Sequence, residues 1–210
     1  LYRLRPHGPI LELPFDRDWA VDGKSLDDRS GAGHHGKLHT DDGFNKAVYG
    51  QVGPYALQMD GVDDYVAVGP EAGLDLRDGR FTQAAWVFVS SEGDGAEPIF
   101  SSAARASADQ QYPSLEVANG TQLRAGFGDG SDSHSFTTGD VLSAEAWHHV
   151  AATYDGNTYR IYVDGVERAA NDGMAGSTPA EAQGFDVGRG ASGGPTCGTL
   201  DLQTIVPHAC

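Results

Sequence analysis

Cysteine and lysine are scarce in this sequence. Its 210 residues include two cysteines, Cys197 and Cys210, and three lysines. Two thiols alone cannot build a zinc site, and no cysteine spacing typical of metal sites is present. If the two thiols are bridged, they close a loop of about 14 residues, which is worth roughly 3 kcal/mol and implies an oxidising compartment. Free or intermolecular thiols are the alternative.

Positive charge and long apolar runs are also lacking. The chain has 14 basic and 30 acidic side chains, a formal net charge of −16. This surface repels nucleic acids and anionic membranes, so neither is an expected partner. No apolar run approaches the roughly 18 to 20 residues of a membrane-spanning helix, so membrane insertion is not expected either.

Cations are the partners that this charge favours. Aspartate greatly outnumbers glutamate, and the short aspartate side chain suits both turns and hard-cation sites. The alternative to specific cation sites is a solvated acidic surface.

Glycine, by contrast, is abundant, and strand patterns follow one another along the chain. The 29 glycines indicate many turns and few helices. The clearest pattern is the stretch Trp147 to Glu167, in which alternating strand segments flank Asp155-Gly156-Asn157 and Asp164-Gly165. Glycine after aspartate accepts the positive φ of tight hairpin turns. This stretch therefore predicts a meander of three strands.

Further strands are expected on the same grounds of alternation and turn residues. The run from Phe81 to Ser91 is nearly continuously apolar and predicts a central strand, with Trp86 in the core. The other expected strands are residues 10–15, two strands within 55–68 around an acidic turn, 98–103, 114–118, 122–127, 134–138, 185–188 and 200–206. Together they predict an all-β protein of two stacked antiparallel sheets.

The first nine residues differ from the rest. Leu1 to Pro9 contain two arginines and two prolines, which predicts a short N-terminal arm ahead of a single domain spanning residues 10–210. The arm is either disordered or an extended segment that docks on a neighbouring subunit, giving self-association through residues 1–9.

Several segments, in order, carry a family pattern. They are PFDRDWAVDGKSLDDRSGAGHHG, ALQMDGVDDYVAV, FTQAAWVFV, AWHHVAATYDGNTYRIYVDGVE, FDVGRG and GTLDLQTI. With them the chain resembles the laminin G-like jellyroll domains of the concanavalin A-like lectin/glucanase superfamily. The resemblance covers the sequence from about Ile10 onward and implies a two-sheet antiparallel jellyroll with adjacent first and last strands.

The resemblance also implies a structural calcium ion near that strand junction. Carried over residue by residue, the candidate ligands are Asp28, Asp60 and Asp201, with a carbonyl oxygen from Gly36. Calcium is accordingly the expected cofactor. Exposed aromatic residues are the usual platforms for glycans, and Trp19, Tyr112 and Tyr162 are the candidates. The alternative is that each of them is packed or partly covered.

The sequence does not support catalysis. The E-x-D-x-x-E strand of jellyroll glycosidases and the Arg, Gln, His and Tyr cluster of related lyases are absent, and no Gly-x-Ser-x-Gly elbow occurs. We therefore expect a non-catalytic recognition module, secreted or at the cell surface, that binds glycans or extracellular proteins, as in cell adhesion. The alternative is a structural subunit of a secreted filament, sheath or surface layer that assembles through the N-terminal arm.

Overall fold

A computed structural model describes residues 8–18, 20–43, 46–69, 76, 79–90, 95–102, 108–180 and 184–189, and the backbone of residues 197–207. Its strands are β1 (Leu11–Leu13), β2 (Ser25–Leu26), β3 (Gly36–His39), β4 (Ala47–Tyr49), β5 (Tyr55–Asp60), β6 (Tyr65–Val68), β7 (Phe81–Val89), β8 (Ala96–Ser102), β9 (Ser114–Ala118), β10 (Gln122–Gly128), β11 (Ser133–Thr137), β12 (Ala146–Tyr154), β13 (Tyr159–Val163), β14 (Val166–Asn171), β15 (Phe185–Val187) and β16 (Cys197–Pro207). A single 3-10 turn, η2 (Ala108–Gln110), is the helical element of the described part.

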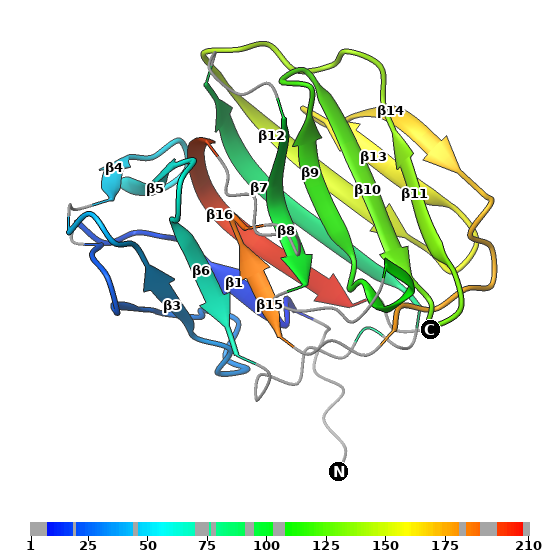
Figure 1. Cartoon of the computed structure of the whole chain (residues 1–210), viewed down its shortest axis with the longest axis horizontal. Coiled ribbons are helices and arrows are strands. Elements are labelled where there is room, and N and C mark those ends of the chain that lie inside the picture. The colour runs from blue at the N-terminus through cyan, green and yellow to red at the C-terminus, as the bar shows by residue number, and fades with distance from the viewer. Residues whose placement is uncertain are drawn as a thin grey trace.

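The strands form two antiparallel sheets stacked face to face (Figure 1). Sheet A has the order β14-β13-β12-β7-β16-β5-β4, with β1 also paired to β16, and sheet B has the order β11-β10-β9-β8-β15-β6-β3-β2. The two-sheet jellyroll predicted from the sequence is thereby confirmed. The first and last strands pair as the resemblance implies, with Leu11 opposite Ile205 and Leu13 opposite Gln203.

The core lies between the sheets and explains why the meander is so clearly patterned. Alternate residues of β13, namely Tyr159, Ile161 and Val163, are fully buried. They belong to one continuous hydrophobic cluster with residues from both sheets. Because successive side chains of a strand point to opposite faces, the residues between them face solvent.

One core prediction is wrong. Trp86 alternates with the buried residues Ala85 and Val87 in β7 and is only half-buried. It therefore lies on the outer face of sheet A and is not part of the core. The apolar run of β7 is continuous because its outer face carries aromatic residues, and not because both faces are enclosed.

Other predictions fall partly beyond the described residues. Residues 1–7 of the expected arm, and Trp19, are outside them, so the role of the arm stays a prediction. Cys210 is also outside, and Cys197 is described by its backbone alone, so their bridge stays a prediction too. No helix in the described parts of the chain is long and apolar enough to cross a membrane.

Candidate functional site

The outer face of sheet A carries two rows of aromatic rings, here called the aromatic band. It consists of Trp86 and Phe88 on β7 and Trp147 and His149 on β12, all half-buried. The strand register places Phe88 opposite Trp147 and Trp86 opposite His149. The ring centroids of these two pairs are 5.7 Å and 5.5 Å apart, and both pairs are edge-to-face. Each ring fixes its neighbour, so the band is a preformed apolar surface.

Small and polar side chains flank the band on the same face. Next to Trp86 and His149 lie Ala84 and Ala151, which are opposite each other, and Tyr162 follows opposite Ala151. The Tyr162 hydroxyl is 3.5 Å from the Glu167 carboxylate. Burial lowers the pKa of His149, against the opposing effect of the Asp164 carboxylate, so the ring in the band is neutral near pH 7.

A serine, a histidine and an aspartate are hydrogen-bonded together at His148, which lies between two residues of the band on β12. His148 Nδ1 is 2.9 Å from Asp164 Oδ2, and His148 Nε2 is 3.0 Å from Ser143 Oγ. However, the backbone N–H of Ser143 also donates to Nε2, at 3.1 Å. The lone pair that would accept the serine proton is thus already engaged. The geometry assigns His148 to bracing the loop before β12 against the β13–β14 turn.

A second feature is an acidic cluster in the turn after β5. Carboxylate oxygens of Asp60, Asp63 and Asp64 lie within 4.8 Å of one another. Asp64 is fully buried. One buried oxygen of Asp63 and one of Asp64 find no hydrogen-bond partner among the described residues. Such oxygens need a proton donor or a cation, because an uncompensated buried carboxylate is costly.

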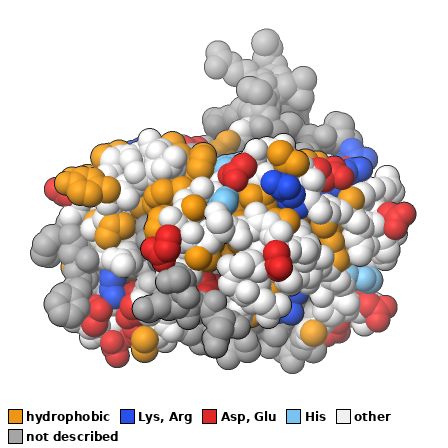
Figure 2. All heavy atoms as spheres, turned by 90° about the horizontal axis from the view of Figure 1, so that it is seen from above, with side chains coloured by type: hydrophobic (Ala, Val, Ile, Leu, Met, Phe, Trp, Pro, Cys, Tyr) orange, Lys and Arg blue, Asp and Glu red, His pale blue; other side chains and the backbone are white. Residues whose placement is uncertain are grey.

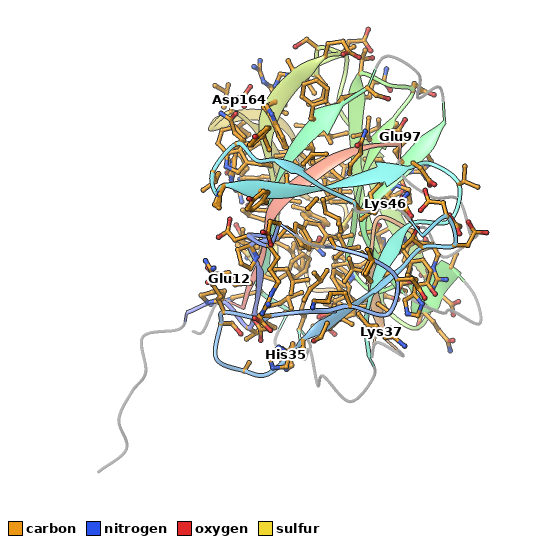
Figure 3. All side chains as sticks on the ribbon, turned by 90° about the vertical axis from the view of Figure 1, so that its left-hand side faces the viewer. Glu12, His35, Lys37, Lys46, Glu97 and Asp164 are labelled. Atoms are coloured by element: carbon orange, nitrogen blue, oxygen red, sulfur yellow. The ribbon has the colours of Figure 1, made fainter. Side chains whose placement is uncertain are left out.

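Lys46 neutralises one side of this cluster. Its Nζ is 2.7 Å from Asp42 and from Asp64, and 3.4 Å from Asp60; Figure 3 labels Lys46. Although burial opposes it, pairing with Asp42 and Asp64 raises the pKa of Lys46 above its usual value. The lysine is therefore permanently charged at physiological pH.

The remaining acidic charge gathers around Asp63. Burial and the carboxylates of Asp41, Asp60 and Asp64 raise the pKa of Asp63. Burial acts in the same direction on Asp60, but N–H donation from Val62 and Asp63 outweighs it and lowers the Asp60 pKa. Lys46 pairs with three aspartates, and Asp63 and Asp41 add two more carboxylates to the cluster, which leaves a local excess of negative charge.

Asp28, the first predicted calcium ligand, organises its own loop. Its carboxylate accepts hydrogen bonds from the backbone N–H groups of Glu12, Ser30 and His34 and from the Ser30 hydroxyl. Although burial acts to raise it, these bonds lower the pKa of Asp28, those from Ser30 most. The loop lies at the end of the sandwich where Glu12 and His35 are labelled in Figure 3.

Three of the four predicted ligands lie on strands, whereas Asp28 lies in the loop between β2 and β3. Gly36 begins β3 in sheet B, opposite Leu26 and Val68. Asp60 ends β5 in sheet A opposite Cys197, which is four residues before Asp201 on β16. The side chain of Asp201 lies outside the described residues, so this set stays a prediction. The acidic turn of Asp60, Asp63 and Asp64 is visible in the sequence, whereas the lysine that pairs with it is not.

The aromatic candidates differ in accessibility. Tyr112 is almost completely buried, which excludes it as a glycan platform, whereas Tyr162 is half-buried on the outer face of sheet A. The surface in general is mixed. Figure 2 shows hydrophobic side chains in several separate groups among acidic, basic and histidine side chains.

Comparison with known proteins finds the same architecture in several solved structures. Among solved structures, domain 4 of an extracellular arabinanase from Geobacillus stearothermophilus, in complex with arabinotriose, is 17% identical with a TM-score of 0.71, covering 98% of this chain and 95% of that one. The botulinum neurotoxin serotype D binding domain is 14% identical with a TM-score of 0.69. That match covers 96% of this chain and 48% of the toxin domain, so the chain spans about half of its length.

A third structure, Trypanosoma rangeli sialidase in complex with the inhibitor DANA, is 17% identical with a TM-score of 0.65, covering 95% of this chain and 31% of that one. At these identities the likeness shows the fold. No curated protein matches the chain in sequence. A laminin G family model, described as the concanavalin A-like lectin/glucanases superfamily, matches residues 60–209. The chain therefore belongs to the laminin G-like branch of the concanavalin A-like lectin/glucanase superfamily.

Proposed function

We propose that this chain is a non-catalytic carbohydrate-binding module and that the aromatic band of Trp86, Phe88, Trp147 and His149 contacts the sugar. The observation that carries the proposal is the pairing of these four rings in two rows on the solvent side of sheet A. Sugar-binding surfaces combine such apolar planes with a few polar groups that fix orientation. Tyr162 and Glu167 supply polar groups beside the band.

Two further considerations support a binding role over catalysis. The arabinanase domain of similar fold is in complex with arabinotriose, and a glycan partner suits a face whose rings are fixed before binding. The hydrogen-bonded chain from Ser143 through His148 to Asp164 gives no free acceptor for the serine proton. An extracellular setting is part of the proposal, and its support is that the arabinanase with a domain of similar fold is extracellular.

A glycan array, followed by affinity measurements on the best ligand, tests this function. Trp147→Ala is expected to weaken binding at least tenfold, because aromatic anchors at the centre of a site carry much of its affinity. Tyr49→Ala is the matched control, since Tyr49 is an aromatic residue that is 89% exposed but lies on β4, away from the band. Equal affinity of both variants and the unchanged protein, or no glycan bound at all, contradicts the proposal.

We also propose that the module is stabilised by calcium. The described geometry favours a site at Asp60, Asp63 and Asp64, with Asp41 beside them. The support is the pair of buried carboxylate oxygens on Asp63 and Asp64 that lack a partner among the described residues. Calcium prefers several carboxylate and carbonyl oxygens in a flexible arrangement, which a turn containing three aspartates provides.

A further inference from the structure

A pocket beside β1 is separate from the aromatic band and from the acidic cluster. It has a volume of about 250 Å³ and lies between the segment after β1 and the segment around β2. Its lining consists of Pro14, Phe15, Asp16, Arg17, Leu26, Asp27 and Arg29. We propose that this pocket binds one uncharged sugar unit. The inference rests on the proposed glycan-binding function and adds to it a second contact site with a defined charge preference.

The lining combines an apolar wall with a charged rim. Pro14, Phe15 and Leu26 are buried and provide the apolar side. At the rim, Arg17 pairs with Asp27, and Arg29 Nη1 is 3.0 Å from Asp16 Oδ2. An apolar wall facing polar groups is the arrangement that suits a sugar ring, which presents C–H groups on one side and hydroxyls at its edge.

The charges at the rim decide which class of sugar fits. Two guanidinium groups and two carboxylates cancel, so the pocket is neutral on a protein with a formal net charge of −16. Each guanidinium carries five N–H donors in a planar fork, so its ion pair leaves donors for ligand oxygens, while the carboxylates accept from ligand hydroxyls. An anionic sugar would meet both carboxylates, and an amino sugar both guanidiniums. A neutral polyol satisfies both kinds of group.

The backbone holds this pocket in a defined shape. Phe15 has a φ of 56°, a left-handed conformation that bulky residues rarely adopt. The Arg17 N–H donates to the Phe15 carbonyl oxygen at 2.8 Å, and the Arg29 N–H donates to the Glu12 carbonyl oxygen at 2.9 Å. Both arginines are thereby anchored through their backbone. Strained residues of this kind concentrate where the surrounding structure fixes a functional geometry.

The size of the pocket limits the ligand to one unit. Pockets for drug-sized molecules measure about 300 to 1,000 Å³, and this one is smaller. Its position also separates it from the band. The pocket is lined by the segments after β1 and around β2, whereas the residues of the band lie on β7 and β12.

The test is chemical-shift mapping of the ¹⁵N-labelled full chain with three probes: methyl glucopyranoside, glucuronate and glucosamine. Methyl glucopyranoside is expected to shift the amides of residues 15–17 and 26–29, with weaker or no shifts from the charged probes. Arg17→Ala is expected to reduce its affinity about tenfold, because a hydrogen bond from a charged group is lost. Arg124→Ala is the matched control, since both arginines are 48% exposed and ion-paired. Arg29→Ala repeats the test should Arg17→Ala disturb folding.

Each other outcome contradicts a specific step. Stronger shifts from glucuronate or glucosamine overturn the charge preference. Shifts confined to the amides of Trp86, Phe88, Trp147 and His149 overturn the pocket but leave the proposed function in place. If glycans of the array bind without shifting pocket amides, the pocket is again wrong. If no probe shifts the amides of the pocket or of the band, and no glycan of the array binds, the proposed function fails as well.

Discussion

Replacement of Asp63 by asparagine is expected to have opposite effects without and with calcium. In the metal-free protein, burial and the carboxylates of Asp41, Asp60 and Asp64 raise the pKa of Asp63. A carboxyl group whose pKa is raised on folding contributes stability below its unfolded pKa, near 4, and loses it as pH rises through the folded value. At pH 7 the ionised group is therefore unfavourable, and Asp63→Asn is expected to raise the melting temperature.

With calcium the expected order reverses. A ligand that binds only the native state at one hundred times its Kd stabilises by about 2.7 kcal/mol. For a chain of 210 residues this corresponds to a rise of roughly 5 to 11 °C, at about 2 to 4 °C per kcal/mol. Asparagine keeps one oxygen but loses the charge. If affinity falls a hundredfold, the gain at the same calcium concentration is only about 0.4 kcal/mol, or roughly 1 °C.

Calorimetry in excess chelator and then in rising free calcium measures both effects. Asp132→Asn is the control, because it removes the same charge from an exposed loop residue outside the cluster. It should leave the calcium-induced rise intact and thereby separate the cluster from the general effect of net charge. If calcium does not raise the melting temperature of the unchanged protein, or raises that of Asp63→Asn equally, the proposed site is wrong.

Three further predictions concern the meander of sheet A. Denaturant unfolding of two tyrosine variants tests the first two. Tyr154→Phe should lower the free energy of unfolding by about 1 to 3 kcal/mol, because the hydroxyl lies 2.5 to 3.0 Å from three backbone carbonyl oxygens. Tyr159→Phe should be neutral or stabilising, since its buried hydroxyl finds no partner among the described residues. Bonds from the Thr158 N–H and from Arg160 lower the pKa of Asp155 to about 2. Its contribution is present above about pH 4 and lost towards pH 2, so Asp155→Asn should flatten the fall in melting temperature across that range. An unchanged pH slope contradicts this.

Local pattern was sufficient to predict most strands of the fold. The meander could be located because Tyr159, Ile161 and Val163 alternate with polar residues and because Gly156 and Gly165 follow aspartates at its turns. Both glycines have positive φ, at 91° and 77°. The short strands β3 and β4 were not predicted. They contain four and three residues, which is too few for a period to emerge.

The aromatic band could not be predicted for a different reason. In β7, Trp86 and Phe88 alternate with Val87 and Val89, and all four residues are apolar. Period-two reasoning depends on a contrast between polar and apolar residues, and an apolar outer face removes that contrast. The face of β7 that carries the band becomes clear only from the paired strand β12, where Trp147 and His149 are opposite Phe88 and Trp86.

The acidic cluster shows how a distant segment changes the meaning of a local motif. The turn of Asp60, Asp63 and Asp64 is visible in the sequence, but Lys46 belongs to the segment before β4. This segment is fixed next to β5 because the Lys46 carbonyl oxygen accepts a hydrogen bond from the Gln58 N–H at 2.8 Å. Lys46 compensates Asp64, the most deeply buried carboxylate. The turn can therefore fold without a metal ion, while the charge around Asp63 remains uncompensated. Calcium at this site should consequently add stability to a protein that already folds, rather than be required for folding.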